Sequence, residues 1–319
     1  MFLVFLRSAI RLSTTFLFGS TGETITERAG HLNLGIPGIM CLGAAGACVG
    51  EEAYLKGLSD MSQANGFAIV LIGILCAMCF AGAGGLLYAF LTITLRSNQN
   101  VSGLAITTFG AGITNFIMPQ VDKTGFTTII SKAFTAYAPG ADGAGWFSDL
   151  FLTYGCLVYI AIVLAILVAG FIKRSKQGLS LRAVGENPAA ADAVGINVIK
   201  YKYVACVVGA GIAGLGGLFF IFDYLGGNWE YTIEALGWLS IALVIFSIWR
   251  PNIGIAGSLI FAAFYILPSY VNVEFQYREL IKMVPYVVTI VVLIATSLLR
   301  KKELQPPASL GVPYFREER

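Results

Sequence analysis

Long stretches without a charged residue divide most of the chain into segments of membrane-spanning length. Seven such stretches cover residues 61–95, 97–121, 150–172, 203–222, 235–249, 251–273 and 283–299. Their apolar residues are continuous rather than alternating, which favours helices over strands. A helix needs about 20 apolar residues to cross the hydrocarbon core of a bilayer. The pattern therefore predicts an all-α fold, a polytopic bundle of transmembrane helices.

The N-terminal region has a less regular pattern. The run at residues 2–22 contains two arginines, Arg7 and Arg11, and residues 29–50 have no full charge but contain several polar residues and a proline. A helix over 36–50 alone would be too short to span a bilayer. We therefore expect eight or nine membrane segments in all, with a broken helix or half-helix near residues 23–50. The side of the membrane on which the N-terminus lies stays open.

The composition strengthens the membrane assignment. Hydrophobic residues make up 57% of the chain, charged residues only 12%, and the mean hydropathy is +0.77. Soluble domains are about 25% charged, so this chain could not cover its surface in water. The net charge of +3 is too small for a nucleic-acid binder. The expected environment is a lipid bilayer, with no nucleic acid as partner.

The charged residues are sorted between the two sides of the predicted bundle. One set of loops contains 13 basic and 5 acidic residues: 173–202, Arg96, Arg250 and 300–319. The opposite set contains 5 basic and 11 acidic residues: 51–65, 119–149, 223–234 and 274–282. Basic loops stay in the cytoplasm. We therefore expect residues 1–299 to form a transmembrane domain with a cytoplasmic loop at 173–202, followed by a disordered cytoplasmic tail at 300–319.

The chain lacks the usual residues of enzymatic and metal chemistry. All six cysteines lie in apolar segments and there is one histidine, so we expect no metal site, no catalytic residues and no cofactor in this chain. No G-x-x-x-x-G-K-S/T sequence occurs, so ATP hydrolysis would need another polypeptide. The G-x-G-x-x-G run at 209–214 lies in an apolar stretch, which favours close helix packing. No acidic residue lies in the seven stretches, which counts against a proton-coupled secondary transporter.

The basic loop contains a short helix with clear boundaries. Asn187 is a favourable N-cap and Pro188 suits the first helical position. Gly195 can adopt the left-handed conformation that ends a helix. These signals predict a helix over 188–194 with a surface that is mostly alanine. Such a helix either docks into a groove of another protein or merely connects two membrane helices.

Three sequence motifs resemble one family of transporters. They are Arg-Ala-Val-Gly-Glu-Asn-Pro-Ala-Ala-Ala-Asp-Ala-Val-Gly-Ile-Asn-Val at 182–198, Glu-Arg-Ala-Gly-His-Leu-Asn-Leu-Gly-Ile-Pro-Gly at 27–38 and Gly-Trp-Leu-Ser-Ile-Ala-Leu-Val-Ile-Phe-Ser-Ile-Trp-Arg-Pro at 237–251. They resemble the permeases of ATP-binding-cassette (ABC) importers for branched-chain amino acids, ribose and nucleosides, and are most similar to the nucleoside subgroup. The resemblance extends over residues 7–299. Ser247 replaces a frequent glycine and Pro37 a frequent acidic residue, which leaves the substrate open.

The resemblance implies a partner for every function that this chain lacks. It implies an importer in a bacterial cytoplasmic (inner) membrane, with a separate ABC ATPase subunit that binds ATP and Mg²⁺. A second, different permease and an extracytoplasmic substrate-binding lipoprotein would complete it. The implied substrate is a nucleoside, most readily a purine nucleoside. Ribose or another sugar, or a branched-chain amino acid, is the alternative, and a self-powered secondary transporter or a membrane enzyme is disfavoured.

The resemblance also assigns roles to particular residues. The helix at 188–194 would be the coupling helix that fits the ATPase, with the contact residues Arg182, Glu186, Asn187, Pro188, Ala189, Ala190, Asp192, Val194 and Gly195. Polar groups at membrane depth are costly unless they are functional or paired. On that ground we expect Asn33, Asn115 and Trp238 to line the substrate pathway. The alternatives are an interhelical hydrogen bond for Asn115 and an interfacial anchor for Trp238.

Overall fold

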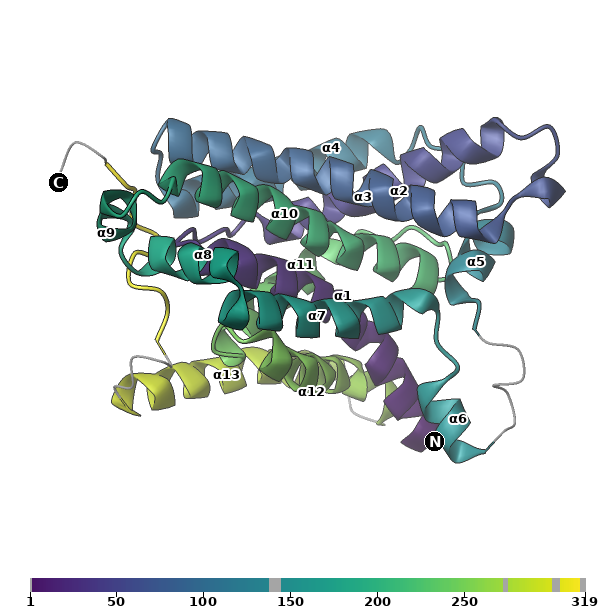
Figure 1. Cartoon of the computed structure of the whole chain (residues 1–319). Helices are drawn as coiled ribbons and strands as arrows, with labels where there is room; N and C mark the ends of the chain where they lie inside the picture. The colour runs from purple at the N-terminus through teal and green to yellow at the C-terminus, as the bar shows by residue number, and fades with distance from the viewer. Residues whose placement is uncertain (1, 138–144, 272–274, 300–304, 316–319) are drawn as a thin grey trace.

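A bundle of long helices forms the molecule (Figure 1). The computed structural model describes residues 2–137, 145–271, 275–299 and 305–315, and every regular element in these ranges is a helix. The long helices are α1 (Phe2–Arg28), α2 (Ile36–Lys56), α3 (Gly66–Ala89), α4 (Gln99–Ile117), α7 (Cys156–Arg174), α10 (Val198–Phe219), α11 (Ile233–Phe246), α12 (Pro251–Tyr270) and α13 (Phe275–Leu299). The predicted all-α architecture is confirmed for the described residues.

Short helical segments connect or extend the long helices. They are η1 (Met61–Gln63), η2 (Phe90–Thr94), η3 (Phe126–Ile130), α5 (Ser131–Thr135), α6 (Trp146–Phe151), α8 (Lys176–Glu186), α9 (Pro188–Ala193) and η4 (Phe220–Tyr224). Figure 1 shows α8 and α9 at one end of the bundle and α5 and α6 at the other. The π-helical segments η2 and η4 continue α3 and α10 without a break.

Helix α10 packs against α1, α2 and α3, and glycines make the close approaches possible. A Cβ at Gly22 of α1 would lie 2.2 Å from the carbonyl oxygen of Gly209 in α10. A Cβ at Gly43 of α2 would lie 2.4 Å from the Cα of Gly214. The glycine run at 209–214 therefore serves helix packing, because only residues without a side chain allow backbones to come this close.

Five helical segments among the described residues are long and apolar enough to cross a membrane: Phe2–Arg28, Gly66–Thr94, Cys156–Arg174, Val198–Tyr224 and Pro251–Tyr270. The expected count of eight or nine is not confirmed. The expected half-helix is corrected, because α2 is one continuous helix of 21 residues that runs past Gly50 to Lys56. Glu51 is buried inside the chain and Glu52 pairs with Lys56 at 2.6 Å, so the carboxylates do not end the helix.

Helix α1 runs the whole length of the bundle. Near its start, Arg7 donates to Thr153 at 2.9 Å and Arg11 pairs with Asp223 at 3.0 Å. At its other end, Arg28 donates to the carbonyl oxygen of Trp249 at 3.1 Å, beside α8 (Figure 1). The start of α1 therefore lies at the end opposite to α8 and α9.

Several carboxylates are buried in the helices, which corrects one sequence argument. Glu23 and Glu27 in α1, Glu51 in α2 and Asp223 in η4 are each at most 1% exposed. The seven stretches were chosen because they lack charged residues, so a search within them could not find an acidic residue. The buried carboxylates lie in helices that contain both apolar and charged residues. The apparent absence of buried acidic residues is therefore no argument about energy coupling.

Candidate coupling site

The short helix α9 has the boundaries that its sequence predicts. The Asn187 side chain accepts a hydrogen bond from the Ala190 amide at 2.9 Å, and Pro188 occupies the first turn. Gly195 adopts a φ of +87°, the left-handed conformation that favours glycine. The helix covers Pro188–Ala193, one residue fewer at its end than the predicted 188–194.

The surface of α9 is smooth and mostly uncharged. Ala189, Ala190 and Ala193 are exposed, and the Val194 side chain is 77% exposed. Ala191 alone in the helix is fully buried, in a small cluster with Val184 and Val198. An exposed alanine surface offers no chemistry, but it offers shape for a groove in another protein.

The polar residues assigned to the coupling surface surround this helix. Arg182 and Asn187 are exposed, whereas Glu186 and Asp192 are half-buried. The structure therefore gathers the nine predicted residues at one end of the bundle (Figure 1). Their role in coupling stays a prediction.

The end of α8 touches the end of α1 through backbone atoms. A Cβ at Gly185 would lie 2.2 Å from the carbonyl oxygen of Arg28 and 3.2 Å from the amide nitrogen of Gly30. Gly185 belongs to the first motif, and Arg28 and Gly30 belong to the second. Two motifs separated by about 150 residues in sequence are thus in direct contact.

The third motif meets the second at the same end of the bundle. The guanidinium of Arg28 donates two hydrogen bonds to the Trp249 carbonyl oxygen, at 3.2 and 3.1 Å. The indole N–H of Trp249 in turn donates to the buried Glu27 carboxylate. Ile248 and Trp249 have φ angles of +55° and +53°, a strained conformation for these residue types. Such strain often occurs at functional sites.

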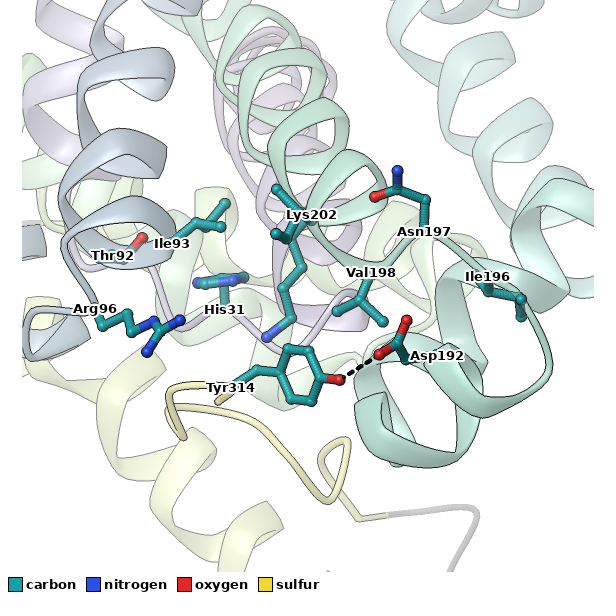
Figure 2. Close-up of a pocket in the computed structure, with 12 residues that line it drawn as sticks. His31, Thr92, Ile93, Arg96, Asp192, Ile196, Asn197, Val198, Lys202 and Tyr314 are labelled. Carbon is teal, nitrogen blue, oxygen red and sulfur yellow. Dashed lines mark hydrogen bonds between the residues drawn. The ribbon is translucent and has the colours of Figure 1, made fainter. Parts of the chain in front are cut away.

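The C-terminal segment also reaches this junction, which the sequence did not predict. The amide of Ser309 donates to the Gly185 carbonyl oxygen at 3.0 Å, and the Tyr314 hydroxyl donates to Asp192 at 2.9 Å (Figure 2). Residues 305–315 of the expected tail therefore contact α8 and α9, whereas 300–304 and 316–319 lie outside the described residues. The apolar residues at 310–315 were the sequence feature that could have predicted this contact.

Asn33 lies in a buried polar cluster beside α1. Its side-chain oxygen accepts from the Gly35 backbone amide at 2.9 Å, and its backbone N–H donates to the Glu23 carboxylate at 3.0 Å. The Asn33 side-chain nitrogen is buried without a hydrogen-bond partner, and the Glu23 carboxyl also lies beside that of Glu27. Unsatisfied buried polar groups are rare, so this cluster is suited to a polar ligand.

The other two predicted pathway residues lie apart from this cluster. Trp238 is half-buried on α11, and the neighbouring Gly237 packs on Pro37 so closely that a Cβ would lie 2.4 Å from the Pro37 Cα. Helix α11 therefore crosses the start of α2, near Asn33. Asn115 is exposed near the end of α4. The structure brings the helix of Trp238 to the Asn33 region but does not bring Asn115 into it.

The loop between α1 and α2 also contains the histidine. His31 is buried, and its ring lies edge-on to Tyr88 with centroids 6.4 Å apart. Burial, and to a smaller extent the Lys202 cation, hold the pKa of the His31 imidazole well below its usual value. The imidazole is therefore neutral at pH 7. No group of three His, Cys, Asp or Glu residues in the described part of the chain could hold a metal ion.

Comparisons with known proteins identify the family of this chain. The sequence profile of the family described as "Branched-chain amino acid transport system / permease component" matches residues 5–293. The nucleoside ABC transporter permease NupC of Lactococcus lactis is 30% identical and the alignment covers 96% of this chain and 95% of NupC. The guanosine ABC transporter permease NupQ of Bacillus subtilis is 29% identical, with coverage of 93% and 92%.

A further relative differs in its named substrate. A Haloferax volcanii chain that is provisionally named a glucose ABC transporter permease is 34% identical, and the alignment covers 80% of this chain and 74% of the relative. All three relatives are named as permease subunits of ABC transporters. The profile match over most of the chain and the three convergent motifs lead to one conclusion: this protein is a membrane-spanning permease subunit of an ABC transporter, in the family of branched-chain amino acid transport system permeases.

Proposed function

We propose that the chain is the permease of an ATP-driven importer for nucleosides, most readily purine nucleosides, in a bacterial cytoplasmic membrane. The observation that supports this most directly is the similarity to the permeases NupC and NupQ over nearly the full length. Its partners would be a separate ATPase with ATP and Mg²⁺, a second permease that differs from this one, and an extracytoplasmic binding lipoprotein. The end with α8, α9 and the C-terminal segment would face the cytoplasm.

The contacts at this end suggest how the ATPase would move the membrane helices. Helix α9 would lie in a groove of the ATPase, and closure of the ATPase pair would displace α8 and α9 together. Gly185 touches Arg28, and Arg28 bonds to Trp249, so the displacement would reach α1 and the turn between α11 and α12. Differential contacts with the two ATPase states would then shift the permease between two conformations.

The polar cluster at Asn33 would form part of the substrate pathway. Its unpartnered side-chain nitrogen could donate to a ring nitrogen or a hydroxyl of a nucleoside. Trp238, on the helix that crosses nearby, could supply a stacking surface for a base. Asn115 would contribute only where its exposed position faces the second permease.

A sugar such as glucose or ribose is the second candidate substrate, and the Haloferax relative favours it. Uptake into proteoliposomes that contain the whole transporter, including the ATPase, the second permease and the binding protein, distinguishes the candidates. We expect ATP-dependent uptake of radiolabelled guanosine or adenosine, with no uptake of glucose, ribose or leucine. Uptake of glucose without nucleoside uptake would overturn the nucleoside assignment and leave the permease assignment intact.

A charged side chain on α9 tests the coupling role. Ala190→Arg places a guanidinium on the exposed alanine surface, and we expect it to abolish both assembly with the ATPase and substrate-stimulated ATP hydrolysis. The matched control is Ala53→Arg, at an exposed alanine of α2 at the opposite end of the bundle. If the Ala190→Arg complex assembles and hydrolyses ATP like the control, α9 is not the coupling helix.

A further inference from the structure

A cavity of about 370 Å³ lies beneath α9, between the end of η2 and the first turn of α10 (Figure 2). Its walls come from four separate parts of the chain: the loop between α1 and α2, the end of η2, the turn from α9 into α10, and the C-terminal segment. Small-molecule sites usually have volumes of about 300–1,000 Å³. The cavity is therefore large enough for a small organic molecule.

Three basic side chains point into this space. Lys202 and His31 are only 2% and 1% exposed, and Arg96 lies at the rim. Figure 2 shows the Lys202 ammonium, the His31 ring and the Arg96 guanidinium directed toward the same region from different sides. They come from three different elements, so only the tertiary structure brings them together.

One carboxylate, that of Asp192, shares the cavity with these groups. Neither Lys202 nor Arg96 forms an ion pair with a described residue. Both ring nitrogens of His31 are buried without a hydrogen-bond partner. The Lys202 side chain is 2% exposed, and its ammonium is costly to hold there unless water or a ligand solvates the charge.

Two other contacts at the cavity do not pair with the Lys202 ammonium. Asp192 also lines the cavity, but its carboxylate accepts from Tyr314 at 2.9 Å. The Arg96 guanidinium stacks on the Phe315 ring, 4.8 Å from its centroid. Neither contact supplies a negative charge to Lys202. Apart from the Asp192 carboxylate, the cavity thus presents hydrogen-bond donors and positive charge to whatever enters it.

We propose that this cavity binds a small phosphate-bearing anion, with Lys202, Arg96 and an imidazole N–H of His31 as its donors. A phosphomonoester has a charge of about −1.5 to −2 at pH 7, which matches two cations. The first turn of α10 adds the positive end of a helix dipole, since Asn197 caps this 22-residue helix beside the cavity. The isoleucine and valine side chains of the walls leave room for an organic group on the phosphate.

The position of the site links its occupant to the coupling helix. A bound anion would contact α10 and the turn after α9, while Tyr314 ties the C-terminal segment to α9 across the cavity. Binding would therefore hold α9 in one position relative to α10. The phosphate could belong to a soluble phosphomonoester, such as a nucleotide, or to the headgroup of an anionic lipid. The inference does not depend on which substrate the permease transports.

Binding to the purified full-length permease in phosphatidylcholine nanodiscs tests the proposal. The probes are radiolabelled adenosine 5′-monophosphate and inorganic phosphate, measured by equilibrium dialysis, with adenosine as the probe that lacks a phosphate. We expect saturable binding of the monophosphate that adenosine does not displace. Lys202→Met should weaken it by roughly tenfold or more, the effect of losing one charge-assisted hydrogen bond. The matched control is Lys200→Met, because Lys200 is exposed in the same turn of α10 and does not line the cavity.

A second variant and a second lipid composition distinguish loss of binding from loss of folding, and a soluble ligand from a lipid. Arg96→Gln changes an exposed side chain, so it should keep the fold and still weaken binding if Lys202→Met fails to fold. When phosphatidylglycerol replaces part of the phosphatidylcholine, a rise in melting temperature that Arg96→Gln abolishes would identify a lipid headgroup as the source. The proposal is overturned if neither soluble phosphate probe binds saturably and the melting temperature ignores phosphatidylglycerol. Binding that survives both Lys202→Met and Arg96→Gln would overturn it equally.

Discussion

At the residue scale, Gly185 is the point where the coupling loop touches the membrane helices. Its α-hydrogens face the carbonyl oxygen of Arg28, and a methyl group there would lie 2.2 Å from that oxygen. The neighbour is backbone, which cannot rotate away as a flexible side chain can. Any side chain at this position would therefore push α8 away from α1.

Replacement of Gly185 by alanine should consequently lower stability and coupling together. We expect a loss of about 1–3 kcal/mol, the usual cost of overpacking, visible as a lower melting temperature in detergent and as reduced substrate-stimulated ATP hydrolysis. Gly170→Ala is the matched control, because a Cβ at Gly170 of α7 would meet nothing within 4 Å. Equal melting temperatures for the two variants would show that the contact with Arg28 is not tight.

Trp249 contributes to the stability of the fold through its indole N–H. That group donates to the Glu27 carboxylate, whose other oxygen is buried without a partner. Trp249→Phe removes this donor from a buried carboxylate, so we expect a stability loss of about 1–3 kcal/mol. Trp146→Phe, at a side chain that is 68% exposed, should cost far less. Thermal unfolding followed by tyrosine and tryptophan fluorescence measures both, and equal losses would argue against the Glu27 contact.

At the element scale, α9 is a helix that its own caps define. It is too short for propensity alone to stabilise it, so it depends on the Asn187 cap, on Pro188 and on the packing of Ala191. The Tyr314 contact with Asp192 adds a tie from outside the loop. The shape of the predicted coupling surface therefore depends on a few specific interactions.

Loss of the cap should make α9 fray without disturbing the bundle. Asn187→Ala removes the hydrogen bond to the Ala190 amide and should cost about 1 kcal/mol of local stability. Hydrogen exchange at the amides of Ala190 and Ala191 should then be roughly five- to tenfold faster, while exchange in α10 stays unchanged. Asn187→Ser, which keeps a capping oxygen, should restore slow exchange. Unchanged exchange in the alanine variant would show that the cap contributes nothing.

At the scale of the whole molecule, the basic loops meet at one end of the bundle. Arg96, Asp192 and Tyr314 line one cavity there, and Arg28 bonds to Trp249 beside Arg250. Acidic and neutral connections, including those with Glu52 and Asp122, lie at the other end, where the Asp122 amide donates to Glu52 at 2.9 Å. This separation agrees with the charge pattern and predicts which end faces the cytoplasm.

Labelling in vesicles of known orientation tests that prediction. Ala190→Cys lies on exposed α9, and Tyr231→Cys replaces a side chain that is 59% exposed at the opposite end. We expect a membrane-impermeant maleimide to label Ala190→Cys only in inside-out vesicles and Tyr231→Cys only in right-side-out vesicles. The unsubstituted protein corrects for its six cysteines. The reverse pattern would invert the proposed topology.

The sequence predicted α9 and the course of most long helices because both depend on local interactions. Asn187, Pro188 and Gly195 act within a few residues of one another, and an apolar run in lipid must form a helix to satisfy its own hydrogen bonds. The continuation of α2 through Glu51 was missed for a physical reason. A carboxylate in sequence signals the end of a span unless one knows that the protein itself buries it.

The sequence by itself thus determined the membrane class, the helical fold, the sorting of charge between the two ends, and the family motifs. Only the tertiary structure decided that Gly185, Arg28 and Trp249 meet, that the C-terminal segment contacts α8 and α9, and that Lys202 shares a cavity with Arg96 and His31. These contacts join residues far apart along the chain. Hydropathy and capping act over one helix, whereas such contacts depend on how all the helices pack together.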